Sequence, residues 1–170
     1  MGCAITARLI AKHKGLSEPE EVSVAALLHD IGKVVLSMKF PEDYEKVLAE
    51  AEGRAIPVLE AEKSHFTITH ADAGGWIARK WNFPNNLVEV IEYHHKPHLS
   101  KRVTVQTAIV HLSDILVRAK GFGFAGDGLV PAVNPSAWQL LELPEEELRE
   151  ILKELEDSLG QAEDFLLSSE

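Results

Sequence analysis

AALLHDIGKVVL, residues 25–36, places a histidine, an aspartate and a lysine inside a segment that is otherwise apolar. Ionised groups are costly to bury unless they are paired, hydrogen-bonded or bound to a metal, so we expect these side chains to meet partners. Lys33 follows His29 by four residues and Asp30 by three, so helical spacing directs all three to one region. Gly32 leaves room there for another helix or a ligand. Such a role would explain the glycine, because glycine within a helix lowers stability by about 1 kcal/mol relative to alanine.

The quoted stretch belongs to a longer helical pattern, residues 17–38. Ser17 is suited to be the N-cap, with Pro19 and Glu20 in the first turn. The segment is apolar on nearly every side, which is typical of a helix buried at the centre of a domain. We therefore predict one continuous central helix over these residues.

The remainder of the chain also has helical patterns, bounded mostly by proline and glycine. We predict helices at residues 3–14, 41–53, 57–66, 70–81, 84–95, 102–120 and 136–141, and a final helix that begins at Pro144. The sequence has no clear two-residue alternation and no Asn-Gly hairpin turn, so strand signals are weak. The pattern predicts an all-α fold.

The composition is that of one globular domain: among 170 residues, 45% are apolar and 26% are charged. No apolar run reaches the roughly 18 residues that a membrane span needs, and the N-terminus does not resemble a signal peptide. We therefore expect no membrane association. Cys3 is the only cysteine, which excludes an internal disulfide and favours a reducing, cytoplasmic compartment.

The net charge of −10 is concentrated near the C-terminus, and residues 1–141 are nearly neutral. The basic stripe that nucleic-acid binding requires is absent, so we expect no nucleic-acid partner. Residues 121–135 are rich in glycine and proline and are predicted to form a loop; they lack the Gly-Lys-Ser/Thr ending of a phosphate-binding loop. The final helix has an apolar stripe that would form core or a docking face for another segment, made of Leu148, Ile151, Leu152, Leu155, Leu159, Ala162 and Phe165.

Three further segments carry metal-ligating residue types. In THADAGGW, residues 69–76, His70 lies in the first turn of a helix, where the dipole disfavours a charged imidazole but not a neutral, metal-bound one. In YHHKP, residues 93–97, His94 and His95 end a helix and could reach one site or two neighbouring metals. In IVHLSDILV, residues 109–117, Asp114 shares a stripe with apolar neighbours, which implies a cationic partner.

Each segment also has a structural interpretation, because a lone buried histidine is usually a hydrogen-bonded core residue and a lone aspartate usually pairs with arginine or lysine. Four such segments in one small helical chain favour a shared site. We interpret the other histidines as structural or surface residues, namely His13, His65, His98 and His111. Trp76 and Trp81 fit helix packing.

In this order, LLHDIGKVVL, THADAGGWIARKWNFPNNLVEVIEYHHKP and IVHLSD resemble the HD superfamily of metal-dependent phosphohydrolases. More narrowly, they resemble the HDOD family, the HD-related output domains of bacterial signalling. The resemblance covers about residues 2–120 and implies an HD-domain-like helical bundle. We expect an HD/HDOD-like core at residues 1–120, the loop at 121–135, and an acidic amphipathic helix at 136–170 that packs on the core.

The resemblance also implies a metal site with one or two divalent ions. Its ligands would be His29, Asp30, His70, His94, His95 and Asp114. Mixed imidazole and carboxylate ligands suit iron, manganese, zinc or cobalt. In an active enzyme, Asp30 and Lys33 would be the catalytic residues: Asp30 would bridge ions that activate a water, and Lys33 would neutralise phosphate.

The sequence departs from the superfamily in three respects. HDOD proteins usually begin with a further helical segment, and this chain starts after it. One further histidine usually precedes the HD helix by about thirty residues, and that position falls before Met1. The Gly-Tyr-Pro element of the cyclic di-GMP phosphodiesterases does not follow His95. We therefore expect a natural short form or the C-terminal part of a longer domain.

The resemblance implies a regulatory output module that binds a partner protein or an upstream sensor segment, with a nucleotide or phosphate as a further candidate ligand. The alternative is a metal-dependent phosphohydrolase or phosphodiesterase that acts on a nucleotide or cyclic dinucleotide. A third interpretation is a purely structural helical domain. The sequence leaves open whether the protein is an enzyme.

Overall fold

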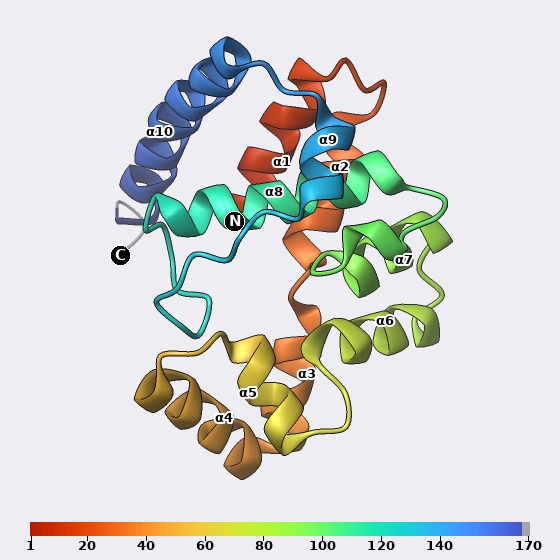
Figure 1. The fold of residues 1–170 in the computed structure, drawn as a ribbon, viewed down its shortest axis with the longest axis vertical. Coiled ribbons are helices and arrows are strands. Elements are labelled where there is room, and N and C mark those ends of the chain that lie inside the picture. The colour runs from red at the N-terminus through yellow and green to blue at the C-terminus, as the bar shows by residue number, and fades with distance from the viewer. Residues whose placement is uncertain (168–170) are drawn as a thin grey trace.

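The structure is a computed structural model that describes the backbone of residues 1–167 and the side chains of residues 1–161. Helices joined by short turns and one longer loop make up the fold (Figure 1). Within residues 1–167 the chain forms no strand, so the predicted all-α fold is confirmed.

The elements follow one another along the chain with few long connections. They are α1 (Gly2–His13), α2 (Pro19–Leu28), α3 (Ile31–Lys39), α4 (Pro41–Arg54), α5 (Val58–His65), α6 (His70–Lys80), α7 (Asn85–Tyr93), the 3-10 turn η1 (Pro97–Leu99), α8 (Thr104–Ala119), α9 (Pro135–Leu141) and α10 (Glu145–Leu167). Apart from the central helix, the boundaries predicted from the sequence lie within two residues of these.

The prediction of one continuous helix over residues 17–38 is wrong. The segment breaks at His29 and Asp30, where Asp30 adopts φ −96° and ψ 10° before α3 begins. No proline or turn sequence marks this break, so its cause lies in packing. The first half, α2, packs on α1, whereas α3 packs on α6.

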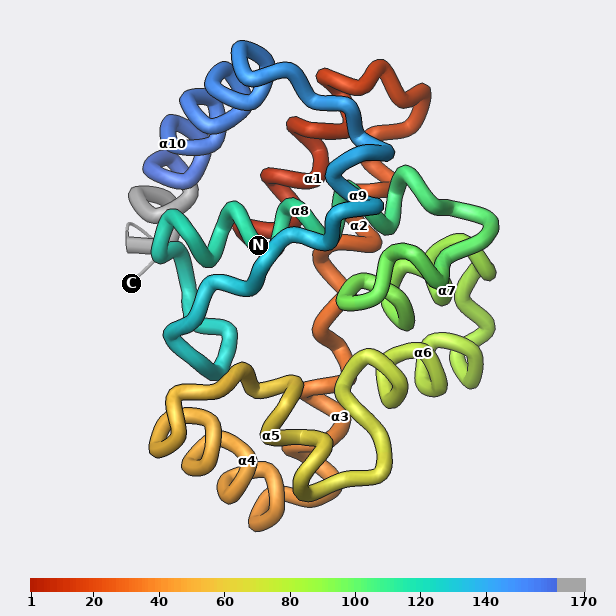
Figure 2. Tube along the Cα trace, viewed as in Figure 1, coloured from red at the N-terminus to blue at the C-terminus, as the bar shows by residue number. Residues whose placement is uncertain are grey.

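The largest core surrounds α8, which lies among α1, α2, α9 and α10 (Figure 1). Its buried apolar side chains come from segments far apart in the sequence and include Ile10, Val22, Ile109, Leu112, Leu141 and Ile151. Smaller apolar clusters join α4 to α5, α3 to α4 and α6, and α6 to α7. The break at His29 and Asp30 therefore lies where the chain leaves the helices around α8 for those of the smaller clusters (Figure 2).

The final helix, α10, packs its apolar stripe against α1. Ile151, Leu155 and Leu159 are buried, and Ile151 belongs to the main core. Of the two interpretations of the stripe, these residues support core. The stripe positions Ala162 and Phe165 lie outside the described side chains.

None of the helices in the described part of the chain combines the length and the apolar character that crossing a membrane would take.

Two glycines allow α3 to contact the start of α6 through the backbone. A Cβ atom on Gly32 would lie 1.8 Å from the carbonyl oxygen of His70 and 2.7 Å from the amide nitrogen of Gly74. No side chain fits in this space, which explains why a glycine interrupts the apolar segment. The contact also places His70 next to the break between α2 and α3.

We expect Gly32→Ala to destabilise the protein by about 2–3 kcal/mol, because overpacking against backbone atoms forces the helices apart. Gly53→Ala in α4 is the matched control, since a Cβ atom there meets no atom within 4 Å. This control should be neutral or slightly stabilising, as alanine favours a helix over glycine. Urea unfolding of both variants measures the difference, and equal stabilities would contradict the proposed contact.

Candidate metal centre

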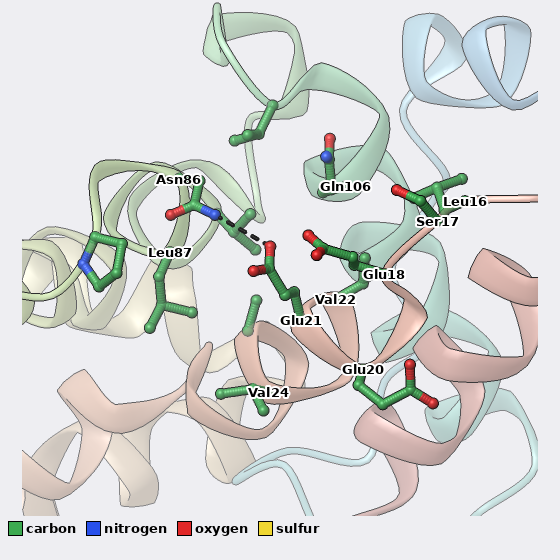
Figure 3. Close-up of a pocket in the computed structure, with 14 residues that line it drawn as sticks. Leu16, Ser17, Glu18, Glu20, Glu21, Val22, Val24, Asn86, Leu87 and Gln106 are labelled. Atoms are coloured by element: carbon green, nitrogen blue, oxygen red, sulfur yellow. Dashed lines mark hydrogen bonds between the residues drawn. The ribbon is translucent and has the colours of Figure 1, made fainter.

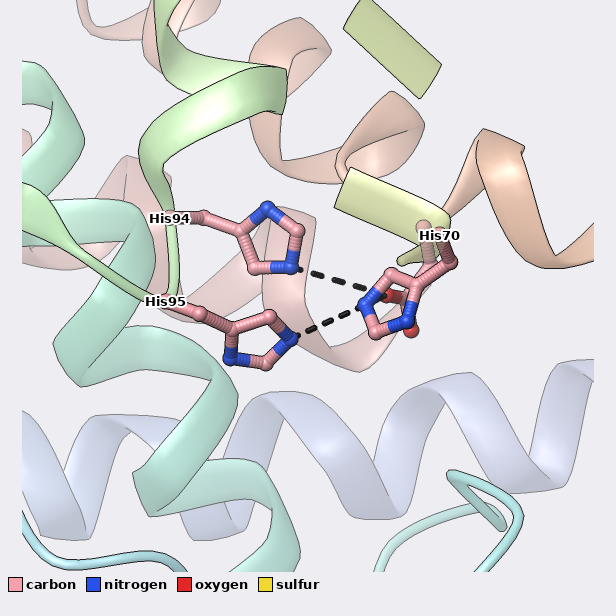
Figure 4. Close-up of side chains that lie close together, drawn as sticks. His70, His94 and His95 are labelled. Atoms are coloured by element: carbon pink, nitrogen blue, oxygen red, sulfur yellow. Dashed lines mark hydrogen bonds and ion pairs between the residues drawn. The ribbon is translucent and has the colours of Figure 1, made fainter. Parts of the chain in front are cut away.

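The six predicted ligand residues lie together where several helices meet. His29 and Asp30 lie at the break between α2 and α3, and His70 is the first residue of α6. His94 and His95 follow the end of α7, and Figure 4 shows their rings directed toward His70. Asp114 completes the group from α8. Helix ends therefore supply most of these side chains.

The carboxylate of Asp30 lies at the centre of the group. One oxygen, Oδ1, lies 3.3 Å from His70 Nε2 and 3.7 Å from His94 Nε2. The other, Oδ2, lies 3.5 Å from His29 Nε2 and 2.8 Å from the Lys33 ammonium. Asp30 thus contacts groups from three separate segments of the chain.

Four of the residues form a compact set of donors. One ligand atom from each of Asp30, His70, His94 and His95 lies within 4.8 Å of every other. A metal with ligand distances of about 2.0–2.2 Å keeps opposite ligands about 4.4 Å apart, so this spacing is close to that of one coordination shell. These four residues could hold a metal ion.

His29 and Asp114 adjoin this set on one side. His29 Nε2 lies 3.8 Å from Asp114 Oδ1, and the Arg118 guanidinium lies 4.0 Å from Asp114 Oδ2. Arg118 also pairs with Asp127, on the loop after α8. The cationic partner expected for Asp114 is therefore His29 together with Arg118.

Hydrogen bonds at Nδ1 determine the tautomers of three imidazoles. His29 Nδ1 donates to the Ala26 carbonyl at 2.6 Å, and His94 Nδ1 donates to the Ile91 carbonyl at 2.7 Å. His70 Nδ1 donates to the Glu62 carboxylate at 2.8 Å. Because a carbonyl or carboxylate only accepts, the proton of each neutral ring lies on Nδ1 and Nε2 carries a lone pair.

The lone pairs on Nε2 leave this site with more hydrogen-bond acceptors than donors. His29 Nε2 and His94 Nε2 are buried and have no hydrogen-bond partner. His70 Nε2 lies 2.9 Å from His95 Nε2, which can donate to it when His95 is neutral and protonated at that nitrogen. Buried polar atoms are rarely left unpaired, and acceptors that face a carboxylate require a cation or a proton between them. The donor set therefore fits a divalent metal.

Burial and neighbouring charges shift the pKa values of the group in opposite directions. Burial lowers the pKa of His94 well below its usual value, and the nearby His95 lowers it further. Burial likewise holds the pKa of His95 well below normal. Burial opposes a charge on His29 too, but the Asp30 and Asp114 carboxylates outweigh it and raise the pKa of His29. Neutral imidazoles, the form that binds metals, are thus favoured at His94 and His95.

Asp30 stays ionised despite its burial. Burial alone would raise its pKa, but His29 and the Lys33 ammonium hold the pKa of this carboxyl well below its usual value. Lys33 donates to Asp30 Oδ2 at 2.8 Å and to the Ala125 carbonyl at 3.0 Å. The predicted phosphate-neutralising lysine therefore links Asp30 to the loop after α8.

Sequence reasoning missed Glu62, which is fully buried and accepts hydrogen bonds from His70. Its short helix carries several polar residues, and no local pattern distinguishes the buried glutamate from the exposed Glu60. His111, interpreted as structural, lies outside the four-residue donor set. It donates to the His94 carbonyl at 2.8 Å and accepts from the Asn134 amide at 2.9 Å. It therefore supports the backbone of His94.

The remaining histidines, Trp76 and Trp81 do not belong to the donor set. His13 and His65 contact glutamates, Glu154 and Glu50 respectively, at the surface. Trp76 and Trp81 are 59% and 52% exposed. More than half of each residue's surface does not pack against the protein, so the prediction that they are helix-packing residues is wrong.

A cavity of about 400 Å³ lies between α2, α7 and the start of α8 (Figure 3). Apolar side chains, among them Leu16, Val22 and Leu87, line it together with three glutamates of the α2 N-terminus. Glutamates are favoured in the first turn of any helix, which accounts for these charges. None of the predicted site residues lines this cavity.

The family model of the HDOD domain matches residues 1–97 of the chain. An uncharacterized protein of Treponema pallidum (strain Nichols) is 27% identical over 96 residues, which are 56% of this chain and 19% of that protein. The chain therefore spans about a fifth of the length of this relative.

Three solved structures are similar to the fold. An HDOD domain protein of unknown function from Geobacter sulfurreducens is 27% identical, with a TM-score of 0.78 over 94% of this chain and 57% of that chain. A protein from Marinobacter aquaeolei VT8, named for signal transduction, is 19% identical, with a TM-score of 0.76 over 99% of this chain and 37% of that one. The MmoQ response regulator from Methylococcus capsulatus str. Bath is 20% identical, with a TM-score of 0.57 over 89% of this chain and 58% of that one. The last two similarities show the fold alone.

We expect the free energy of unfolding of the metal-free protein to fall as the pH decreases from 6.5 toward 5. His94 and His95 have lowered pKa values in the folded protein, so the unfolded chain takes up protons that the folded chain excludes. Each contributes a slope of up to about 1.4 kcal/mol per pH unit. His29, whose pKa is raised, has the opposite effect near pH 6.5, and its contribution disappears as the pH falls further because the unfolded chain becomes protonated there too.

Urea unfolding at several pH values, with chelator present, measures this slope. His94→Asn should flatten it by up to about 1.4 kcal/mol per pH unit, because asparagine does not titrate. His98→Asn, at an exposed histidine outside the donor set, is the control and should leave the slope unchanged. Parallel curves for wild type and His94→Asn would show that His94 is not buried in its neutral form.

Proposed function

The chain belongs to the HDOD family, and from this premise we propose that it is a regulatory output module of bacterial signal transduction with a divalent-metal site. The family match and the similarity to an HDOD domain structure and to a structure named for signal transduction support the regulatory role. The chain spans 37% to 58% of the lengths of the solved structures it resembles, so the activity of any whole protein is part of the proposal. We place the module in the cytoplasm, where such signalling operates.

One observation carries the metal proposal: three imidazole rings donate through Nδ1 to fixed acceptors and thereby direct their Nε2 atoms toward the Asp30 carboxylate. Asp30, His70, His94 and His95 would hold the ion, with His29 and Asp114 beside it. Such mixed ligands suit iron, manganese, zinc or cobalt. When bound, the ion would supply positive charge and an attachment point for an anionic group such as a phosphate.

The position of these ligands suits a regulatory role. Asp30 lies at the break between α2 and α3, whereas His70 begins α6 and His94 follows α7. A ligand that engages these segments together stabilises one arrangement of the helices around them. Binding at the centre is thereby coupled to the positions of the helices that a partner protein contacts.

The partners of the module would be another protein or an upstream sensor segment. The names of the structural neighbours, a signal-transduction protein and a response regulator, support this proposal. A nucleotide or phosphate is the further ligand that a cationic centre would attract.

Metal-dependent phosphohydrolysis of a nucleotide or cyclic dinucleotide is the alternative function. The donor set and the adjacent Lys33 favour it, since together they provide a metal-type centre beside a cation. Lys33, however, already bridges Asp30 and the Ala125 carbonyl, so it would have to exchange partners to contact a phosphate. The regulatory function requires no such exchange, and we favour it for that reason.

We expect protein purified without chelator to retain a divalent transition metal, measured by elemental analysis. His94→Ala and Asp30→Ala should lose most of this metal, and His98→Ala, an exposed control, should retain it. Added metal at about a hundred times its dissociation constant should stabilise the wild type by about 2.7 kcal/mol, visible as a rise in melting temperature. Equal metal content in all four proteins would exclude the proposed centre.

An assay for hydrolysis of a generic phosphodiester, bis(p-nitrophenyl) phosphate, with added manganese distinguishes the two functions. For a regulatory module we expect no turnover above that of Asp30→Ala at the same metal concentration. Metal-dependent hydrolysis by the wild type that Asp30→Ala abolishes would instead support the phosphohydrolase.

A further inference from the structure

We infer that Glu62 is a positioning residue of the metal centre: it holds His70 in the tautomer whose Nε2 lone pair faces Asp30, and it adds negative charge behind that ring. This inference rests on the proposed metal-binding function. Glu62 lies on α5, eight residues before His70, and its hydrogen bonds are with His70 and Tyr44.

The contacts of Glu62 are directed at His70 twice. One carboxylate oxygen, Oε2, accepts from the backbone amide of His70 at 2.8 Å and from its Nδ1 at 2.8 Å. Both side chains are buried, with Glu62 at 0% and His70 at 1% exposure. A carboxylate has no proton to donate when ionised, so this contact requires the proton of His70 to be on Nδ1.

The need for a glutamate follows from where His70 lies in its helix. His29 and His94 end their helices, so the carbonyl three residues earlier, of Ala26 or Ile91, accepts from Nδ1. His70 instead begins α6 and has no preceding helical turn to supply that carbonyl. The acceptor must therefore come from another element, and α5 supplies it through Glu62.

The buried charge of Glu62 is balanced on both sides. Its second oxygen, Oε1, accepts from the Tyr44 hydroxyl at 3.3 Å, so both oxygens are satisfied. The start of α6 adds the positive end of the helix dipole. Removing such a charge from water is costly, and this structure compensates it with three donors around one carboxylate.

Helix capping alone does not account for Glu62. Thr69 and Asp72 already form a capping box at the start of α6. The hydrogen bond between Glu62 and His70 Nδ1 joins two side chains. It satisfies no backbone amide of α6 and therefore does not cap the helix. It matches instead the carboxylate–histidine–metal arrangement, in which an acceptor behind the ring orients the ligand and raises its basicity.

Calorimetric titration with Zn²⁺ tests the charge of Glu62. Glu62→Gln keeps the size of the side chain and removes its charge, and we expect it to weaken zinc binding about 10–100-fold, the usual effect of losing such a partner. Glu50→Gln is the matched control, because Glu50 accepts from the surface His65 at 2.8 Å. We expect the control to bind zinc as the wild type does.

The tautomer of His70 is measured separately, from histidine ¹⁵N chemical shifts of the metal-free wild type. We expect the proton on Nδ1, and in Glu62→Ala a population with the proton on Nε2. Failure of the wild type to bind zinc would refute the metal function, whereas the tautomer would still report on Glu62. The inference is overturned if wild-type His70 carries its proton on Nε2, a measurement that needs no variant, or if Glu62→Gln binds zinc as tightly as the wild type.

Discussion

The structure depends on one constraint: several hydrogen-bond acceptors face one another in the interior of the protein. The Asp30 carboxylate and the lone pairs of His29, His70 and His94 point toward one another across 3.3–3.7 Å. Electrostatic repulsion between such groups is strong where water is excluded, so they remain together only with positive charge among them. The Lys33 ammonium supplies part of this charge, at 2.8 Å from Asp30. A divalent metal would supply the remainder.

The ends of the helices position and orient the side chains of this site. The break between α2 and α3 lets His29 end one helix and Asp30 precede the next, so adjacent residues reach the centre from different helix ends. The carbonyl groups of the last turns orient His29 and His94, and a buried glutamate orients the ring of His70, which begins its helix. The Gly32–His70 backbone contact brings these ends within reach of one another.

For a regulatory module, this arrangement would couple ligand binding at the centre to the conformation of the protein. The ligand residues belong to helices that pack in separate apolar clusters, so occupancy of the centre and the relative positions of those helices depend on each other. The loop after α8 takes part as well, because the Ala125 carbonyl shares Lys33 with Asp30 and Asp127 pairs with Arg118. A phosphohydrolase could use the same residues, but only if Lys33 exchanged these partners.

Sequence alone determined the all-α fold and most helix boundaries, because apolar periodicity, proline and glycine are local signals. It also predicted the six candidate ligands, partly from charged groups within apolar segments and, as a set, from the resemblance to the HDOD family. Only the tertiary structure decided that the predicted central helix breaks at Asp30, since the break is imposed by packing of α3 on α6 and has no local marker. It also decided that Glu62 is buried behind His70 and that Trp76 lies exposed. Burial of a polar or aromatic residue on a short helix depends on which helix covers it, and that is a property of the whole chain.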